Sequence, residues 1–530
     1  MIGPIPVCVI GLASPGRYLG SVPTLMVEPT AVQLEEEKLS PQADLPPVPA
    51  PAQPAPRGLR YAQILLLVLL FSSPALMSLR GSCANDGDIW WHMRTGEWIL
   101  QHHSVPRVDA FSGPAAGQSW VAYSWLFELI VAKLFLWKGL VGLAMYTTGM
   151  ILVISAAVYH MVRRLQADLA VAALLTFAAM FGMGRMFTPR PWLFTILFFV
   201  LELDILAQVR RTGKTRELLW LPVIFAFWAN VHIQFVDGLM VLGFAWVHAI
   251  LARRQPAMES RVRPLWLGAA LFASVLATLV NPYGWRIYAV AHDLATQAGA
   301  LNKITELQAI PFRNLADFLI LLLAMGSAAA LAWQRRPAYF EGGLLIFAAV
   351  LTFRSQRDVW VMATVAAMIL ASTISRKGRT DGGLPRFTTR MTVVIAAFVL
   401  AAGFSVFRVN NAELESRMTS DWPIQAVEAI QQKGYPGPLF NDFNWGGYLI
   451  WNLRVPVSID GRQNLYGDPR MDRSVATWGG APDWASDSEL RSAGLVIGPT
   501  GAPLSQLLKT DPHFQLAYSD KVATVFVAKK

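Results

Sequence analysis

The sequence predicts an α-helical polytopic membrane protein, with about 11 transmembrane helices followed by a small α/β domain. Hydrophobic residues make up 54% of the 530 positions and charged residues only 15%. Many apolar runs reach the roughly 17–25 residues that a helix needs to cross a bilayer. From about residue 410 these runs stop, and short strand and helix patterns alternate instead.

The N-terminal part divides into a tail and a first membrane helix. Residues 1–60 are predicted to be disordered, because 34–57 is rich in Glu, Pro, Ala and Gln and cannot build a core. The uncharged stretch 61–79 is the first predicted span. Arg57 and Arg60 precede it, which favours an N-terminus inside the cell.

The positive-inside rule orders the remaining spans. If the apolar stretch 120–137 crosses the membrane, most basic clusters between spans fall outside. If it lies along the surface, all of them fall inside, so we expect 88–103 and 120–137 to be juxtamembrane helices in an outer loop, 80–138. The other predicted spans are 139–161, 168–186, 191–209, 217–233, 235–252, 264–281, 315–333, 339–353, 357–374 and 390–407.

This topology gives a transmembrane domain at 61–409 and an extracytoplasmic α/β domain at 410–530, which lies in the periplasm if the cell has one. The expected location is the cytoplasmic (inner) membrane. The net charge of +10 comes from basic clusters between spans, so it does not indicate nucleic-acid binding. Only two cysteines occur, far apart, and they imply no disulfide framework.

The C-terminal domain shows alternating elements. A helix capped by Ser420-Asp421 is expected to end near Lys433. Strands are predicted at 438–441, 455–459, 495–497 and 522–527, and helices at 447–451 and 504–508.

The first outer loop opens with a cluster of polar and aromatic residues. Asp88 is a predicted N-cap, because its carboxylate can accept from the amides of the helix that follows. His92 lies one turn later on the same face, and Asp86 precedes the helix. The simpler, purely structural interpretation is a capped interfacial helix that tryptophans anchor at the membrane surface.

Further polar residues gather on the same predicted side of the membrane. Such groups are costly near lipid, so a one-sided collection indicates a site. For each arginine, contact with lipid headgroups is the simpler interpretation. The residues are Arg185, Arg190, Asn230, His232, Glu306, Arg354 and Arg357.

An acid that faces several arginines suits group transfer from a lipid phosphate. The acid removes a proton from the acceptor hydroxyl, and the arginines hold phosphate without losing charge. No phosphate-cradling glycine loop is present, which argues against a nucleotide donor, and no hydrolase or metalloprotease motif occurs. His92, His102 and His103 with nearby acids could bind a metal, but their loose spacing makes this the less favoured interpretation.

Several stretches resemble the C-type (GT-C) membrane glycosyltransferases, the superfamily of protein O-mannosyltransferases and lipid A aminoarabinose transferases. The first outer loop carries three of them: Asp88-Ile-Trp-Trp-His92-Met-Arg-Thr-Gly96-Glu-Trp98, Val105-Pro-Arg-Val-Asp109-Ala-Phe-Ser112 and Trp120-Val-Ala-Tyr-Ser-Trp125-Leu-Phe-Glu128. Others match a bacterial branch of it: Arg190-Pro191, Trp228-x-Asn230-x-His232, Asn281-Pro-Tyr-Gly-Trp285, Asn441-Asp-Phe-Asn-Trp-Gly-Gly-Tyr-Leu-Ile-Trp451 and Ile459-Asp-Gly-Arg462.

The resemblance implies a sugar donor on polyprenyl phosphate, an outer acceptor that is a lipid, glycan or protein, and inversion at the anomeric carbon. It also implies that Asp88, or else Asp86, is the catalytic base. A paired Asp-Glu motif of many members has no clear match, and Glu306 and Asp358 are the only candidates for it. A divalent cation is therefore left open.

Two other functions remain in view, a transporter or flippase of lipid-linked sugar and a non-catalytic envelope assembly protein. A transporter would favour broken helices and related halves, and no internal repeat is evident. In the tail motif, the segment Trp445–Tyr448 is better explained by a tight turn packed on aromatics, with the glycines there for backbone geometry, than by ligand binding.

Overall fold

The computed structural model describes most of the chain from Asp86 onward. The described ranges are 86–166, 168–254, 261–297, 304–334, 337–374, 409–418 and 422–529. The predicted tail at 1–60, the predicted spans at 61–79 and 390–407, and the predicted cap at Ser420-Asp421 lie outside them.

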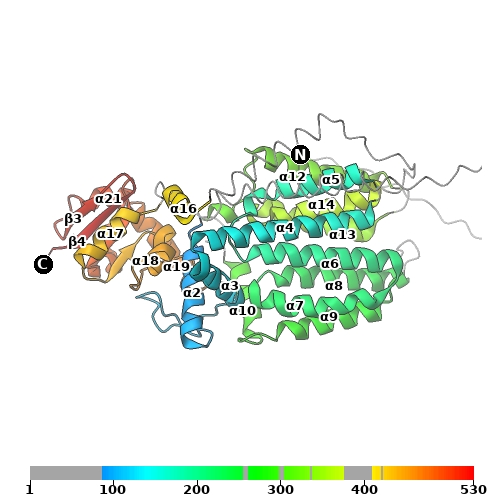
Figure 1. Cartoon of the computed structure of the whole chain (residues 1–530), viewed down its shortest axis with the longest axis horizontal. Coiled ribbons are helices and arrows are strands. Elements are labelled where there is room, and N and C mark those ends of the chain that lie inside the picture. The colour runs from blue at the N-terminus through cyan, green and yellow to red at the C-terminus, as the bar shows by residue number, and fades with distance from the viewer. Residues whose placement is uncertain are drawn as a thin grey trace, which may run out of the picture. The chain divides into compact units, whose positions relative to one another are not determined.

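A bundle of apolar helices occupies the predicted transmembrane stretches (Figure 1). Its helices are α4 (Leu140–Leu165), α5 (Leu169–Gly182), α6 (Trp192–Thr212), α7 (Trp220–Val231), α8 (Phe235–Arg254), α9 (Pro264–Thr278), α12 (Leu315–Ala332), α13 (Tyr339–Arg354) and α14 (Val359–Ile374). Among the described residues, 5 helices are long and apolar enough to cross a membrane by length and composition: α4, α6, α8, α12 and a segment that includes α14.

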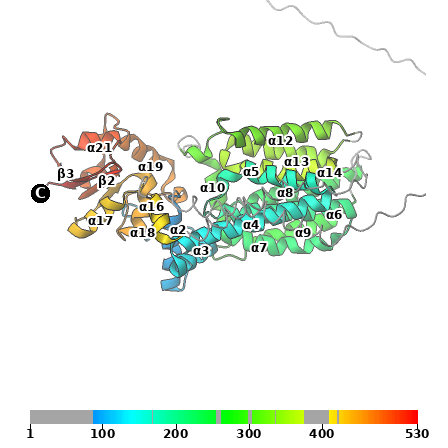
Figure 2. The ribbon, with the colours of Figure 1, turned by 45° about the horizontal axis from the view of Figure 1, so that its top comes forward.

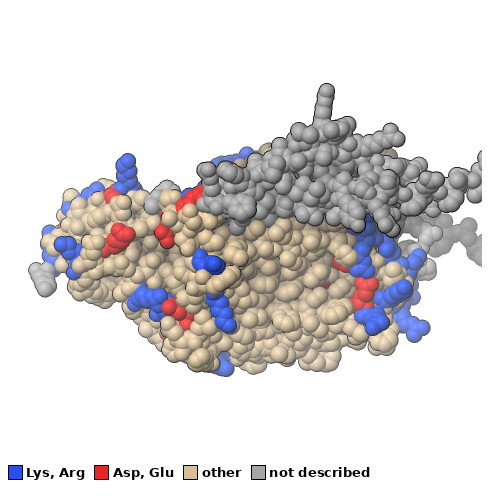
Figure 3. All heavy atoms as spheres, viewed as in Figure 1, with Lys and Arg blue, Asp and Glu red and all other residues tan. Residues whose placement is uncertain are grey.

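The two ends of the bundle differ in charge. Basic pairs lie in the last turns of α4, α6 and α8, at Arg163-Arg164, Arg210-Arg211 and Arg253-Arg254. On the face shown in Figure 3, Lys and Arg side chains gather at that end, and the adjoining middle of the bundle is almost free of charge. The chain therefore has the one-sided basic pattern from which its topology was predicted.

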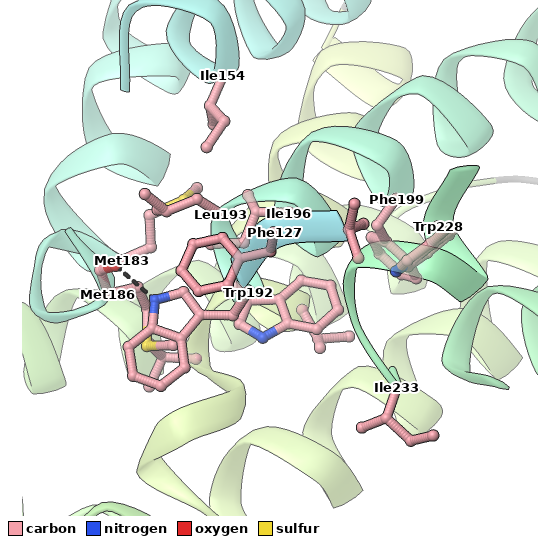
Figure 4. Packing of buried hydrophobic residues seen from close by; sticks show 14 of the residues in the cluster. Phe127, Ile154, Met183, Met186, Trp192, Leu193, Ile196, Phe199, Trp228 and Ile233 are labelled. Carbon is pink, nitrogen blue, oxygen red and sulfur yellow. Dashed lines mark hydrogen bonds between the residues drawn. The ribbon is translucent and has the colours of Figure 1, made fainter. Parts of the chain in front are cut away.

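The core of the bundle is built from large apolar side chains that pack between helices (Figure 4). Phe127, Phe199 and Trp228 are fully buried. Trp192, at the start of α6, donates from its indole nitrogen to the Met186 carbonyl at 2.7 Å, as Figure 4 shows. This bond fixes a tryptophan near the end of the bundle opposite the basic pairs.

Two short helices, α2 (Ile89–His102) and α3 (Trp125–Lys138), lie between the bundle and the C-terminal domain (Figures 1 and 2). They match the predicted juxtamembrane helices. They pack closely because Gly96 has no side chain, and a Cβ there would collide with the Glu128 backbone.

The predicted cap of α2 is wrong in one respect. The Asp88 side chain caps no amide; instead Asp86 Oδ1 accepts from the amides of Asp88, at 3.0 Å, and Ile89, at 3.3 Å. Asp86 therefore does the capping. The Asp88 carboxylate is left to make other contacts.

The C-terminal domain contains a four-stranded sheet in the order β1-β2-β4-β3. Its strands are β1 (Leu439–Asn441), β2 (Leu495–Pro499), β3 (Phe514–Ser519) and β4 (Ala523–Ala528), with β1 and β2 parallel and the other pairs antiparallel. Its helices are α17 (Ile424–Lys433), α18 (Gly446–Asn452), α19 (Gln463–Trp478), α20 (Ser488–Ser492) and α21 (Pro503–Leu508), and α16 (Asn411–Met418) precedes it.

Three of the four predicted strands are confirmed. The prediction for 455–459 is wrong, because that segment makes only an isolated bridge, from Val457 to Ser112 in the first outer loop. Instead Val457 exchanges backbone hydrogen bonds with Phe111 and Gly113 of that loop, while Val455 is 40% exposed. The polar-rich α19, the edge strand β3 and a further helix, α10 (Arg286–Thr296), were not predicted.

The domain packs directly against α2 through its glycine motif. A Cβ at Gly447 would lie 2.6 Å from the Gly87 carbonyl oxygen, so the close approach requires glycine. Next to it, the Tyr448 ring packs edge-on against Trp90, with centroids 5.2 Å apart. The motif thus packs on aromatics as predicted, but its glycines begin the helix α18 and permit close approach, so the predicted tight turn is wrong.

Candidate active site

Two cavities meet at the start of α2, at the end of the bundle away from the basic pairs. The smaller has a volume of about 240 Å³ and the larger about 920 Å³. Both are lined by Asp88, Arg190 and Arg357, together with Gly461 and Gln463 from the C-terminal domain. The shared residues make this junction the place where two substrates could meet.

Arg190 is the centre of an ion-pair cluster. It lies just before α6, and its Nε donates to Asp86 Oδ2 at 2.5 Å while Nη1 donates to Asp88 Oδ2. Glu306 approaches its third nitrogen at 3.7 Å. The guanidinium group also lies over the Trp192 ring, 5.1 Å from the centroid. One arginine thus holds two predicted catalytic carboxylates in place.

The two aspartates differ in environment. Asp86 is 3% exposed at its side chain, lines only the larger of the two cavities and is used for capping and for Arg190, whereas Asp88 is 25% exposed and lines both cavities. Burial raises the pKa of Asp86, although Arg190 opposes the shift. Asp88 is therefore the more accessible of the two carboxylates.

The other predicted arginines reach the cavities with different partners. The Arg357 guanidinium group also lies over the Trp192 ring, 4.9 Å from its centroid. Its buried Nε has no hydrogen-bond partner among the described residues. Arg354 lines the smaller cavity. Arg185 lines the larger one, but it donates to Gln356 at 2.7 Å and to the buried Asp317. Arg354 and Arg357 are thus better placed than Arg185 to hold an anion in the smaller cavity.

His232 lines the smaller cavity and is held by a chain of hydrogen bonds. The Trp228 indole donates to Thr195 Oγ1 at 2.8 Å, and the Thr195 hydroxyl shares a hydrogen bond with His232 Nδ1, also at 2.8 Å. Either partner of the second bond can be the donor, depending on the tautomer of the ring. The chain fixes the position of the imidazole at the cavity wall.

His92 forms a buried pair with a residue outside the predicted site. Its Nδ1 lies 3.0 Å from Glu128 Oε1 on α3, and both side chains are nearly inaccessible. Burial and then Arg190 lower the pKa of His92, and burial raises the pKa of Glu128. Both shifts favour the uncharged forms at neutral pH, so a neutral imidazole lines the smaller cavity.

Asn230, predicted to line the site, joins helices instead. Its amide accepts from the Trp125 indole at 2.8 Å and donates to the carbonyls of Ala226 and Val280. It lines neither of the two cavities described above. Asn230 and His232 belong to the same sequence motif, which is why both were predicted to line the site.

Sequence reasoning missed several residues of the cavities. Tyr123 and Glu128 lie within a motif of the first loop, and burial raises the pKa of Tyr123 to about 12, so its hydroxyl stays protonated. The missed lining residues are Tyr123, Asp237, Gly461, Gln463 and Asn464. The signals for Tyr123 and Gly461 were their motifs, Trp120–Glu128 and Ile459-Asp-Gly-Arg462; the others carried none that separated them from ordinary polar residues.

A metal site was left open by the sequence. Within the described ranges, no three His, Cys, Asp or Glu side chains come together so that they could hold a metal ion.

Comparisons with known proteins bear on the fold. No protein-family model matches the chain, and no curated protein matches its sequence. The archaeal oligosaccharyltransferase AglB from Archaeoglobus fulgidus, solved with an inhibitory peptide and a dolichol-phosphate, is similar in structure: the TM-score is 0.53 at 12% identity, over 90% of this chain and 75% of AglB.

ArnT from Cupriavidus metallidurans is similar over almost its whole length. Bound to undecaprenyl phosphate, it gives a TM-score of 0.51 at 14% identity, over 89% of this chain and 98% of ArnT. Its apo structure gives 0.52 at 13% identity, over 88% and 97% of the two chains. Both neighbours are GT-C glycosyltransferases. The chain therefore has the fold that AglB and ArnT share, the GT-C fold.

Proposed function

We propose that the protein is a membrane glycosyltransferase that moves a sugar from polyprenyl phosphate to an acceptor on the outer side of the cytoplasmic membrane. The observation that carries this proposal is the junction of two cavities at Asp88, with arginines on either side. The fold supports it, because the AglB and ArnT structures of the same fold hold dolichol-phosphate and undecaprenyl phosphate.

The smaller cavity suits the donor. Arg190, Arg354 and Arg357 line it, and arginine binds phosphate oxygens bidentately. On its other side it is lined by apolar residues of α8, α10 and α13, including Val236, Leu294 and Leu351, which suit a polyprenyl chain. His232 adds a hydrogen-bonding side chain to the cavity wall. The phosphate and the sugar would thus lie between cations and apolar helices.

The larger cavity suits the acceptor. It extends from Asp88 to the C-terminal domain, whose residues Trp422, Asn444 and Trp445 line it. This cavity can admit a hydroxyl-bearing lipid, glycan or protein group from the side of the soluble domain. Asp88 lies where the two bound substrates would touch.

The reaction then runs as a single displacement. Asp88 takes the proton of the acceptor hydroxyl, and the acceptor oxygen attacks the anomeric carbon of the sugar. The bond between that carbon and the phosphate oxygen breaks, and polyprenyl phosphate leaves with the electron pair. The arginines stabilise the charge that develops on the phosphate. Attack from the side opposite the phosphate gives inversion.

Loss of the protein tests the proposal in cells. Mass spectrometry of envelope glycans and lipid-linked sugars should show one glycan that lacks a sugar in a deletion strain, and accumulation of the matching polyprenyl-phosphate sugar. Complementation with the wild-type chain should restore both. If the variant Asp88→Asn complements fully, the protein acts without this base, as an assembly protein or a lipid flippase would.

The orientation requires its own experiment. A reporter that is active only outside the cytoplasm should be active when fused after Ala528 and inactive when fused after Arg211. The opposite pair of results would place the site in the cytoplasm and exclude an outer acceptor.

A further inference from the structure

The motif Ile459-Asp-Gly-Arg462 has no role in the mechanism above, yet it enters the site. Gly461 and Gln463 line both cavities, and Asn464 lines the smaller one. All of these residues belong to the C-terminal domain. A short segment of that domain thus forms a wall of the site at the junction of the two cavities.

Gly461 lies directly against the Asp88 carboxylate. A Cβ at this position would collide with Asp88 Oδ1 and would also lie 2.7 Å from its Cγ. The carboxylate oxygen therefore occupies the room that a side chain would take. The other oxygen, Asp88 Oδ2, accepts a hydrogen bond from Arg190. Gly461 and Arg190 thus contact the two carboxylate oxygens from two different parts of the chain.

The residues on either side of Gly461 fix its position. Asp460 and Arg462 are 0% and 1% exposed, and they bond to each other at 2.8 Å and 2.7 Å. Arg462 also donates to Asp109 of the first outer loop at 2.5 Å. This network ties the segment to the same loop that carries Asp88, so Gly461 cannot shift independently of it.

We propose that Gly461 is a positioning residue that sets the orientation of the Asp88 carboxylate, and that the C-terminal domain thereby completes the catalytic site. The proposal rests on the proposed function, in which Asp88 is the base. Arg190 limits the carboxylate on one side and the Gly461 backbone on the other. The one orientation left directs Asp88 to the junction where the acceptor hydroxyl would lie.

The variant Gly461→Ala tests this role. Its methyl group must displace the carboxylate, and misplacement of a catalytic group by about 1 Å costs on the order of 10²-fold in rate. We expect kcat for sugar transfer to fall by that factor, while KM for the polyprenyl-phosphate sugar stays within about twofold. The matched control is Gly501→Ala in the same domain, where a Cβ would meet nothing within 4 Å, and it should keep wild-type kinetics.

A double-mutant cycle separates positioning from a general structural effect. In an Asp88→Asn background, Gly461→Ala should change the residual rate by less than about twofold, because the group it displaces is no longer a base. A further hundredfold loss there would overturn the proposal, and so would a near wild-type kcat in the single variant. Wild-type membranes that transfer no sugar would refute the proposed function, and with it the base that Gly461 is said to orient.

A second substitution covers poor folding of Gly461→Ala. The variant Asp88→Glu lengthens the side chain toward the same backbone, while both partners of the domain interface remain. We expect a loss of at least about tenfold, since the longer carboxylate cannot fit between Arg190 and Gly461. Wild-type activity of Asp88→Glu would show that the fit is loose and would overturn the proposal.

Discussion

Two arginines in this protein each hold a pair of aspartates, and they differ in access. Arg190 holds Asp86 and Asp88, and its side chain is 10% exposed at the junction of two cavities. Arg462 holds Asp109 and Asp460, and all three side chains are 0% exposed. The charges are alike, so the arrangement of charge alone does not mark a site.

The surroundings of the two clusters explain the difference. Around Arg462, the hydroxyl of Tyr466 and the amide of Ser112 also donate to the aspartates, and the guanidinium group lies 4.9 Å from the Trp120 ring centroid. The polar groups of this cluster are therefore occupied by one another. Around Arg190, Asp88 is a quarter exposed, and Nε of the neighbouring Arg357 has no hydrogen-bond partner among the described residues. A sealed cluster joins domains, whereas an open one with spare capacity can bind and react.

The largest expected effect is on stability, at the sealed cluster. Replacing Arg462 with Met leaves Asp109 and Asp460 buried without a cation, and breaking a buried ion pair in this way costs about 3–5 kcal/mol. Thermal denaturation of the detergent-purified protein should show a large loss of stability, with earlier proteolysis of the C-terminal domain. The control is Arg417→Met, which breaks an exposed pair with Glu413 and should change stability by less than about 0.5 kcal/mol.

At the open cluster the main effect is on rate. Because Asp86 and not Asp88 caps α2, Asp88→Asn should leave folding almost unchanged and remove the base, with a loss of about 10²–10⁴-fold in sugar transfer. A radiolabelled-sugar assay in membranes measures it at matched protein level. Asp168→Asn is the matched control, since Asp168 caps α5 at the basic end of the bundle. Retention of more than a tenth of the activity by Asp88→Asn would assign the base elsewhere.

The geometry of Arg190 should matter more than its charge. Arg190→Lys keeps the cation but replaces the planar fork, whose Nε and Nη1 bond to Asp86 and Asp88, with a single nitrogen. The loss of one charged hydrogen bond of about 1.5–3 kcal/mol corresponds to about 10–100-fold in rate. The same transfer assay measures this. Arg454→Lys, at an exposed pair with Glu97, should have no effect. Equal activity of Arg190→Lys and the wild type would show that only the positive charge of Arg190 is needed.

The smallest effect separates the two roles of Asp86. Asn caps a helix about as well as Asp, whereas Ala does not, so Asp86→Ala should be less stable than Asp86→Asn by about 1 kcal/mol. Both variants lose the charge that faces Arg190, so the difference between them isolates the cap. The melting temperatures of the two purified variants give this comparison, and equal values would mean that α2 needs no cap.

The sequence predicted the parts of the fold that have a strong local signal. Long apolar runs marked the bundle helices, and the motif around Asp88 marked the junction of the cavities. The cap was assigned to the wrong aspartate, because Asp86 and Asp88 are equally good caps by type and only the contact with Arg190 decides between them. Asn230 was misplaced for a similar reason: its neighbour His232 faces the cavity, but its own amide turns toward Trp125.

The C-terminal contribution could not be predicted because it depends on contacts between distant residues. Asp109 and Arg462 are 353 positions apart, and nothing near either residue indicates the other. The segment 455–459 has the composition of a strand but pairs with the first loop at a single bridge. A local sequence pattern can predict whether a segment is a helix or a strand. The contacts of these residues depend instead on which distant segment they pack against.

The long separation between Asp109 and Arg462 also sets an order of events during synthesis. A ribosome makes Asp88 and Arg190 early, but the wall formed by Gly461 exists only after most of the chain has been made. Until then, Asp109 in the first loop is without its cation. A chain cut short before Gly461 would carry the whole Arg190 cluster and still lack this wall, so a truncated product could not enclose Asp88.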